Sequence, residues 1–240
     1  MSILKKIIEK SNIGTKMLGI LIDPDHLSKL SELQESIDNL KKFPPDFVFI
    51  GGSLINNHFF DTCVTTLKEA LRIPIIIFPG NNQQISPSAD ALLLLSLVSG
   101  RNPEFLIGQH VQAAFELDKS NLELLSTSYL LIDCGATTSA QYMSNTTPIP
   151  YLKNNIAAAT ALASKQIGTS ICYLDGGSGA EKPISSTMIS TVKKTIKSPL
   201  IVGGGIRDKT SIKAAWAAGA DLVIIGTAFE ENPSIIAQLR

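Results

Sequence analysis

Two oxygen-bearing side chains stand directly after the first two apolar runs of the chain. Asp23 follows the run 17–22, and Ser53 follows the run 47–50 after a pair of glycines. One anionic and one neutral oxygen form a sparse ligand set, which suits an Mg²⁺ ion that completes its shell with water and substrate phosphates. The Asp-Pro-Asp sequence that begins at Asp23 is also a good turn and helix N-cap. Asp23 and Ser53 are therefore candidate Mg²⁺ ligands, with a structural role as the alternative.

Three glycine-bearing segments, 173–180, 202–207 and 226–228, each follow a short apolar run near the C-terminus. Glycine lets backbone N–H groups approach an anion closely, and a (β/α)8 barrel binds phosphate after its seventh and eighth strands. A tight turn would explain any one segment, whereas the spacing of the set favours a shared phosphate site. The predicted substrate-binding residues are Tyr173, Leu174, Asp175, Gly176, Gly177, Ser178, Gly179, Gly204, Gly205, Gly226 and Thr227.

The first of these segments also carries groups that a phosphate grip alone does not need. Tyr173, Asp175 and Ser178 supply a phenol, a carboxylate and a hydroxyl, which can hold a small polyol or accept its proton. A core tyrosine and a capping aspartate are the alternative interpretation. Asp175 and Tyr173 are the candidate catalytic residues, and His110, within a helical stretch, is assigned no role.

The composition excludes several classes of partner. The chain has 240 residues, with 21 basic and 21 acidic side chains, so no net charge favours nucleic acid or an anionic membrane. No run approaches the roughly 18 apolar residues of a transmembrane helix, and 1–9 is predicted as a short amphipathic helix rather than a signal peptide. The three cysteines, at 63, 134 and 172, have no metal-ligand spacing and predict buried thiols in a reducing cytoplasm.

The elements that must position these residues alternate along the whole chain. Eight continuous apolar runs of strand length lie at 17–22, 47–50, 75–78, 91–95, 129–132, 171–174, 200–202 and 222–225. Segments of helical periodicity lie between most of them, at 27–41, 60–71, 103–125, 154–167, 186–196 and 209–218. Continuous apolar strands are typical of parallel sheets that are buried on both faces. The pattern predicts one (β/α)8 TIM barrel domain over 1–240, with a doubly wound open sheet as the alternative.

Two connections depart from the alternation. The segment 79–90 is too short and too polar for a full helix between the third and fourth strands, so that helix is predicted to be missing. Its absence would open a groove along the side of the barrel, next to the apolar stretches 75–78 and 92–95, for a long chain. The segment 134–151 is a long loop, and loops of that length in compact domains are usually functional lids or face a partner.

Taken together, these motifs resemble the geranylgeranylglyceryl phosphate synthase family, in the second of its two groups. Besides the glycine segments, the resemblance is carried by Leu21-Ile22-Asp23-Pro24-Asp25, Gly51-Gly52-Ser53, Ser99-Gly100-Arg101-Asn102-Pro103, Gly108-Gln109-His110, Tyr142-Met143-Ser144-Asn145 and Pro148-Ile149-Pro150, and it covers 20–228. It implies a barrel that joins a polyprenyl diphosphate, geranylgeranyl diphosphate above all, to the 3-hydroxyl of sn-glycerol 1-phosphate. The product would be an ether-lipid precursor of phospholipid biosynthesis, and diphosphate would be released.

By the same resemblance, Asp23 and Ser53 would hold Mg²⁺, the three glycine segments would hold glycerol phosphate, and the protein would be a homo-oligomer, a dimer or a hexamer. Asp175 stands where the family usually has Glu, proposed to take the hydroxyl proton. Two other functions remain open: a sugar-phosphate isomerase or aldolase, although no strand ends in lysine, and a barrel that only binds a prenyl phosphate. The sequence does not determine the length of the prenyl donor.

Overall fold

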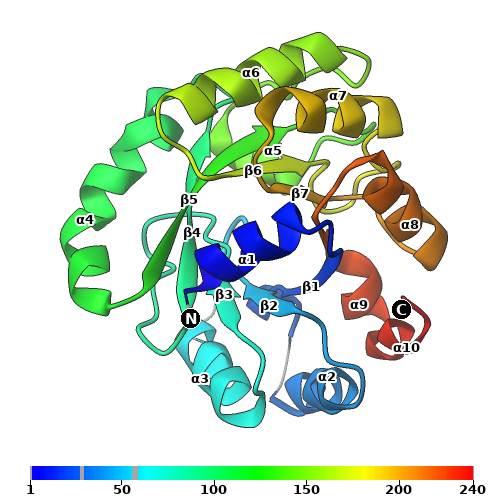
Figure 1. The fold of residues 1–240 in the computed structure, drawn as a ribbon. Coiled ribbons are helices and arrows are strands. Elements are labelled where there is room, and N and C mark those ends of the chain that lie inside the picture. The colour runs from blue at the N-terminus through cyan, green and yellow to red at the C-terminus, as the bar shows by residue number, and fades with distance from the viewer. Residues whose placement is uncertain (1, 28–29, 56–58, 240) are drawn as a thin grey trace.

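The computed structural model describes residues 2–27, 30–55 and 59–239. Eight parallel strands form a closed barrel in sequence order (Figure 1). They are β1 (Met17–Ile22), β2 (Phe47–Ile50), β3 (Ile75–Ile77), β4 (Ala91–Leu97), β5 (Glu123–Leu131), β6 (Ile171–Asp175), β7 (Leu200–Gly203) and β8 (Leu222–Ile225). The closed sheet confirms the barrel and excludes the open, doubly wound alternative.

The helices surround the strands, as the alternating sequence predicts. They are α1 (Ile3–Asn12), α2 (Leu30–Lys42), α3 (Phe60–Ala70), α4 (Gln109–Ser120), α5 (Ser139–Ser144), α6 (Asn154–Gln166), α7 (Ser186–Ile196), α8 (Lys209–Ala218), α9 (Thr227–Glu231) and α10 (Ile236–Leu239). The predicted helix 27–41 corresponds to α2, except that residues 28–29 lie outside the described part of the chain. Among the described residues, no helix has the length and apolar character that crossing a bilayer requires.

Side chains alternate between two apolar cores. Phe47 and Phe49 of β2 point into the barrel, while Val48 and Ile50 of the same strand pack against the outer helices. Successive side chains of a strand point to opposite faces, so a strand that is buried on both faces must be apolar throughout. The continuous runs in the sequence therefore follow from the barrel itself.

Helix α1 closes the end of the barrel at which the strands begin (Figure 1). Its Ile3 and Ile7 are buried in the interior core, and the carboxylate of Glu123 accepts hydrogen bonds from the backbone N–H of Ile3 at 2.6 Å and of Leu4 at 2.9 Å. Four N–H groups at a helix N-terminus have no partner within the helix, so a carboxylate there stabilises both the helix and its attachment to the barrel. The predicted amphipathic helix is confirmed, with residue 1 outside the described residues.

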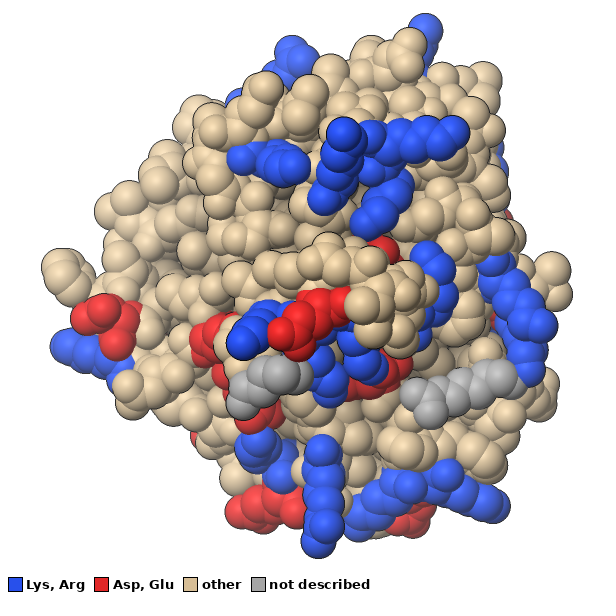
Figure 2. Space-filling view, in the orientation of Figure 1, with Lys and Arg blue, Asp and Glu red and all other residues tan. Residues whose placement is uncertain are grey.

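Three aspartates repeat one arrangement around this same end. Asp46, Asp90 and Asp221 stand before β2, β4 and β8, and each accepts a hydrogen bond from a backbone N–H at the start of the preceding strand and another from a lysine. The N–H donors are those of Leu18, Ile75 and Leu200, and the lysines are Lys10, Lys68 and Lys193. Figure 2 views this face and shows basic side chains gathered on it with acidic ones among them. We refer to the three aspartates as the lower rim.

The lower rim makes a testable contribution to stability. Asp221 is buried, and its Oδ2 lies 2.7 Å from the Leu200 nitrogen and 2.6 Å from Lys193 Nζ. Replacement of Asp221 by Ala leaves the buried Leu200 N–H without this acceptor and the Lys193 ammonium without its carboxylate, although Lys193 keeps the Ser198 carbonyl and the Ser11 hydroxyl. We expect the free energy of unfolding to fall by roughly 3 kcal/mol. Urea unfolding measures the change. Lys5→Ala is the control, because its exposed pair with Glu9 spans 3.9 Å. A loss below about 1 kcal/mol for Asp221→Ala would contradict the assignment.

The boundary between α4 and β5 differs from the prediction. The predicted helix 103–125 begins where it was expected, with a π-helical turn at Glu104–Gly108 that leads into α4. It is wrong at its C-terminal end, because the chain reverses at Asn121, whose φ is 59°. Strand β5 then begins at Glu123, well before the predicted start at 129. The centre of β5 is polar, unlike the apolar runs that are typical of buried strands. The Ser128 hydroxyl can be buried there because it donates a hydrogen bond to the Ser164 hydroxyl at 2.8 Å. The other strands agree with the prediction to within two residues.

The prediction that no helix lies between β3 and β4 is confirmed, because the described residues of that connection contain none. The segment instead lies along α3 through three side-chain contacts, which we call the α3 ladder. They join Asp61 to Ser86, Thr65 to Ser88 and Lys68 to Asp90. The three α3 residues are spaced by four and three positions and so lie on one face of the helix. These contacts hold the second half of the connection on α3, while Asn82 in its first half is hydrogen-bonded to Gln109 and Gln112 of α4.

Candidate functional site

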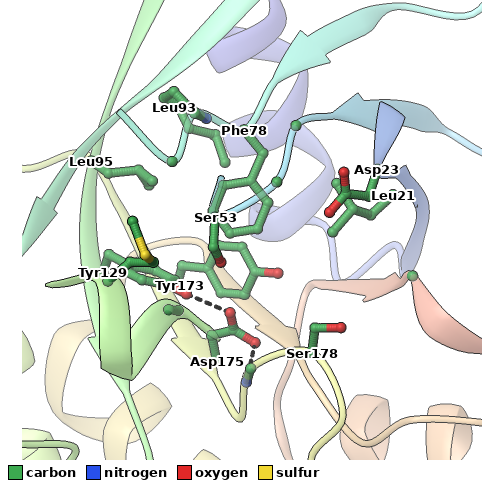
Figure 3. Close-up of a pocket in the computed structure, with 18 of the residues that line it drawn as sticks. Leu21, Asp23, Ser53, Phe78, Leu93, Leu95, Tyr129, Tyr173, Asp175 and Ser178 are labelled. Atoms are coloured by element: carbon green, nitrogen blue, oxygen red, sulfur yellow. Dashed lines mark hydrogen bonds between the residues drawn. The ribbon is translucent and has the colours of Figure 1, made fainter. Parts of the chain in front are cut away.

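A pocket opens at the end of the barrel opposite α1 and continues down one side (Figure 3). Among its lining residues are most of the predicted site residues: Asp23, Ser53, Tyr173, Asp175, Gly177, Ser178, Gly179, Gly204, Gly205, Gly226 and Thr227. Two predicted residues do not line it. The Leu174 side chain is buried in the outer core, and Gly176 packs next to Cys134 and Ala180. The loops after β1, β2, β6, β7 and β8 thus converge on one cavity.

The glycines after β6 and β7 pack backbone against backbone. Gly204 has a φ of 81°, and a Cβ there would lie 2.6 Å from the Gly177 nitrogen. Gly177 itself has a φ of 82°. The loop after β8 completes the arrangement, since the Ser178 and Thr227 hydroxyls lie 3.4 Å apart. Positive φ and close approach both require glycine here. The three loops present backbone and hydroxyl groups to the pocket, and Arg207 of the loop after β7 also lines it, as an anion site needs.

Asp175 lies on the floor of the pocket with both oxygens held. Its Oδ2 accepts a hydrogen bond from the Tyr129 hydroxyl at 2.5 Å, and its Oδ1 accepts one from the Gly177 N–H at 2.8 Å (Figure 3). Burial raises the pKa of Asp175, while these two hydrogen bonds lower it. A carboxylate with a raised pKa that faces a cavity is suited to accept a proton.

Three aromatic rings form the apolar wall beside this carboxylate. The centroid of Phe78 lies 5.8 Å from that of Tyr129 and 5.2 Å from that of Tyr173, and the two tyrosine rings are 5.5 Å apart, edge to face. The Tyr173 hydroxyl points into the pocket and makes no hydrogen bond to another described residue (Figure 3). It is therefore available to a bound molecule.

Asp23 is fixed by its backbone and leaves carboxylate oxygen toward the pocket. Its N–H donates to Glu230 Oε1 at 3.0 Å, and its Oδ1 accepts from the Asp25 N–H at 3.0 Å. The carboxylate packs closely against Gly52, where an added Cβ would lie 2.3 Å from Oδ2. Ser53 is the next residue of the chain after Gly52. Burial raises the pKa of Asp23 to about 6. A half-buried carboxylate of this kind gains from a cation, and the oxygen donors fit Mg²⁺.

The predicted alternative for Asp23 also holds in part. Its Oδ1 caps the short 3-10 turn at Pro24–His26, so the residue has a structural role as well. The described residues contain no cluster of three or more His, Cys, Asp or Glu side chains that could enclose a metal. An Mg²⁺ ion bound here would therefore keep most of its shell for water and substrate oxygens.

Three residues of the site were not identified from the sequence. Tyr129 holds Asp175, Glu230 holds the Asp23 N–H, and Gln84 joins two loops, donating from Nε2 to the Gly52 carbonyl at 2.8 Å and accepting the Gly80 N–H at 3.0 Å. Each is distant in sequence from the residue that it positions. The polar character of 79–90 is visible in the sequence, but it does not reveal that Gln84 is buried.

The side of the pocket is an apolar groove between β4 and α4. Leu92, Leu94, Ile85, Ala113 and Leu117 line it, at the place that a helix between β3 and β4 would otherwise cover. Met143 of α5 also lines the pocket, so the long loop 134–151 carries a short helix over its mouth. His110 Nε2 donates to the Leu95 carbonyl at 2.7 Å. The predicted groove is confirmed.

Comparison with known proteins agrees with this geometry. A family model described as the PcrB family matches residues 12–239. A geranylgeranylglyceryl phosphate synthase of Chitinophaga pinensis is 44% identical, over 97% of this chain and 92% of its own, and that of Pyrococcus furiosus is 40% identical, over 90% and 85%. The crystal structure of (S)-3-O-geranylgeranylglyceryl phosphate synthase from Thermoplasma acidophilum, in complex with its substrate sn-glycerol-1-phosphate, superposes with a TM-score of 0.92 at 30% identity, covering 100% of this chain and 96% of that one.

Proposed function

The chain belongs to the PcrB family, and from this membership we propose that it is a prenyltransferase, a geranylgeranylglyceryl phosphate synthase. The reaction joins a polyprenyl diphosphate, geranylgeranyl diphosphate above all, to the 3-hydroxyl of sn-glycerol 1-phosphate and releases diphosphate. The observation that carries the proposal is one pocket in which glycine loops, a buried carboxylate and an apolar groove are continuous. A sugar-phosphate isomerase has no use for the groove, and a simple prenyl-phosphate carrier has no use for the carboxylate.

The acceptor would bind at the polar end of the pocket. Its phosphate suits the backbone N–H groups of the loops after β6, β7 and β8, apart from that of Gly177, which donates to Asp175, with the hydroxyl of Thr227 beside them. Backbone N–H groups directed at one point bind a phosphate without a charged side chain. The glycerol hydroxyls would then face Tyr173 and Asp175.

The transfer moves one proton and breaks one bond. The glycerol 3-hydroxyl oxygen forms a bond to C1 of the prenyl chain, the bond from C1 to the diphosphate oxygen breaks, and its electron pair leaves with the diphosphate. Asp175 accepts the hydroxyl proton. The aromatic wall of Phe78, Tyr129 and Tyr173 keeps water from a reacting carbon that carries positive charge, and the π faces stabilise that charge.

Asp23 and Ser53 would hold Mg²⁺ at the other side of the pocket. When bound there, Mg²⁺ neutralises the charge that develops on the leaving diphosphate. The residues of the chain supply the position: Glu230 fixes the backbone of Asp23, and Gln84 fixes the carbonyl that precedes Ser53.

Assembly and location form part of the same proposal. Ile107, Val111 and Phe115 follow one another along an exposed face of the helical segment that contains α4, with exposed fractions of 59%, 67% and 83%. Such a stripe supports a homo-oligomer, a dimer or a hexamer by family resemblance. The three buried free thiols support a reducing, cytoplasmic setting.

A direct assay tests the reaction. The purified protein is incubated with labelled sn-glycerol 1-phosphate, Mg²⁺ and prenyl diphosphates of several chain lengths, and the organic extract is examined for ether-linked product. We expect product with at least one donor, and none with sn-glycerol 3-phosphate in place of the 1-phosphate at the same concentration. Failure with every donor would overturn the proposal.

The α3 ladder predicts a selective effect on the prenyl donor. Ser86 is fully buried, and its hydroxyl donates to Asp61. Ser86→Ala releases one tie of the connection that borders the groove, so we expect KM for the prenyl diphosphate to rise about fivefold, the equivalent of one hydrogen bond. KM for glycerol phosphate should not change. Steady-state kinetics with each substrate varied in turn measures both.

The matched control for this prediction is Ser128→Ala. Ser128 is equally buried and also bonds a side chain of another element, Ser164, but it faces α6 rather than the groove. Ser128→Ala should lower the free energy of unfolding by a similar amount and leave KM unchanged for both the prenyl diphosphate and glycerol phosphate. Equal effects of the two variants on KM for the donor would show that the ladder has no specific part in donor binding.

A further inference from the structure

Tyr129 and Asp175 form the shortest side-chain contact in the pocket, and the proposed chemistry does not by itself require it. We propose that Tyr129 is a positioning residue of the transfer, and that its hydroxyl sets both the orientation and the basicity of the Asp175 carboxylate. The inference rests on the proposed function, in which Asp175 accepts the proton. It assigns the Tyr129 hydroxyl no contact with the substrate.

The geometry leaves the Tyr129 ring little freedom. Strands β5 and β6 run side by side with Tyr129 opposite Tyr173, two residues before Asp175. Both side chains point into the barrel, and edge-to-face packing against Phe78 and Tyr173 fixes the ring plane. A ring held in this way presents its hydroxyl at one point, 2.5 Å from Asp175 Oδ2. Because the Gly177 N–H holds the other oxygen at 2.8 Å, the carboxylate cannot rotate without losing one of two hydrogen bonds.

The charges around Asp175 make Tyr129 a constant donor. Burial and the neighbouring Asp175 raise the pKa of Tyr129 well above its ordinary value, so the phenol keeps its proton throughout the working pH range. The other titratable groups near the carboxylate are Tyr173 on β6 and Cys134 in the loop after β5, and burial raises the pKa of both, to about 12 for the thiol. On β7, the residue opposite Asp175 is Gly203, which carries no charge. No cation contacts the carboxylate among the described residues, so the hydroxyl is its main stabilising side chain.

The hydrogen bond from Tyr129 changes the basicity of Asp175, and the direction of the change follows from the charge that it stabilises. It stabilises the charged carboxylate and so lowers the pKa of Asp175, against the larger effect of burial, which raises it. Asp175 is therefore kept deprotonated to a lower pH than burial alone would permit. When Asp175 accepts the glycerol proton, Tyr129 keeps its own proton and still donates to the now neutral carboxyl group. No further proton moves in this step.

Tyr129→Phe tests the inference, because it removes the hydroxyl and retains the ring. We expect kcat to fall about tenfold, KM for glycerol phosphate to stay within about twofold, and the acidic limb of the kcat profile to move to higher pH. A purely structural role would lower the melting temperature and leave the limb in place. In an Asp175→Asn background, Tyr129→Phe should have little further effect on kcat, since it acts through the carboxylate.

A second measurement needs no activity. The Gly177 N–H donates to Asp175, so its amide resonance in NMR spectra reports protonation of that carboxyl group, and its titration midpoint should move to higher pH in Tyr129→Phe. Tyr151→Phe is the matched control, because it removes a tyrosine hydroxyl that bonds the Pro183 carbonyl outside the pocket. It should change neither the midpoint nor kcat.

The outcomes separate the two proposals. If Tyr129→Phe changes neither the acidic limb of the kcat profile nor the titration midpoint of the Gly177 amide, the inference is overturned. The proposed function still stands in that case if the parent protein forms product. If the parent forms no product, the proposed function fails, and the Gly177 titration still decides whether Tyr129 sets the basicity of Asp175.

Discussion

We expect Asp175→Asn to lower kcat by a factor of about 10²–10⁴, the range that general acid–base catalysis supplies, and to leave the binding of glycerol phosphate nearly unchanged. The amide has almost the size of the carboxylate and can still accept the Gly177 hydrogen bond through its oxygen. It cannot take up the proton of the glycerol 3-hydroxyl. Single-turnover rates measure the chemical step, and calorimetry with glycerol phosphate measures binding.

The direction of the expected pH dependence of kcat follows from the pKa of Asp175. Burial raises the pKa of Asp175, and the base must be deprotonated to act, so kcat of the parent falls as pH falls through this raised pKa. The residual activity of Asp175→Asn should lack that limb. Asp133→Asn is the matched control, because Asp133 also accepts the N–H of a glycine two residues on, Gly135, but is exposed and outside the pocket. Equal rates of parent and Asp175→Asn across pH would exclude Asp175 as the base.

Asp23→Asn has the second large effect, on the metal requirement. Replacing the only carboxylate of the proposed ligand pair removes the charge that attracts the cation, so we expect the Mg²⁺ concentration for half-maximal rate to rise at least about tenfold. The amide retains one oxygen that can cap the turn after it, and the fold should remain intact. Titration with Mn²⁺, followed by electron paramagnetic resonance, measures binding independently of turnover.

Asp208→Asn is the control for this variant, since Asp208 caps α8 outside the pocket and asparagine caps a helix nearly as well. It should bind Mn²⁺ as the parent does. Unaltered Mn²⁺ affinity in Asp23→Asn would remove Asp23 from the proposed site and leave it only the capping role. Chelation with EDTA should stop the parent enzyme, and added Mg²⁺ should restore it.

The features predicted best from the sequence are those that depend on residue type at one place in the chain. A glycine at Gly204 is required by the backbone there, and an aspartate after β1 faces the strand ends in any barrel of this kind. The missing helix is visible as a short polar segment. For these features the local sequence contains the physical cause.

The features that were missed depend on contacts between distant segments. Tyr129 lies in a stretch typical of core strand, and its importance comes from Asp175, 46 residues later. Strand β5 is longer than predicted because the polar side chains at its centre are satisfied in the fold: Ser128 by hydroxyls on and just after α6, and Thr127 by the Leu125 carbonyl. No local pattern reveals the partners of Ser128. Such positions follow from the packing of strands and helices and need the fold to be identified.

The lower rim has a consequence for how this protein can change over evolutionary time. Its three aspartates hold strand starts together at the end of the barrel that the pocket does not reach. Substitutions along the groove alter residues that take no part in those hydrogen bonds. The lineage can therefore accept mutations that lengthen or shorten the groove, and so change the accepted donor, without losing the closed barrel.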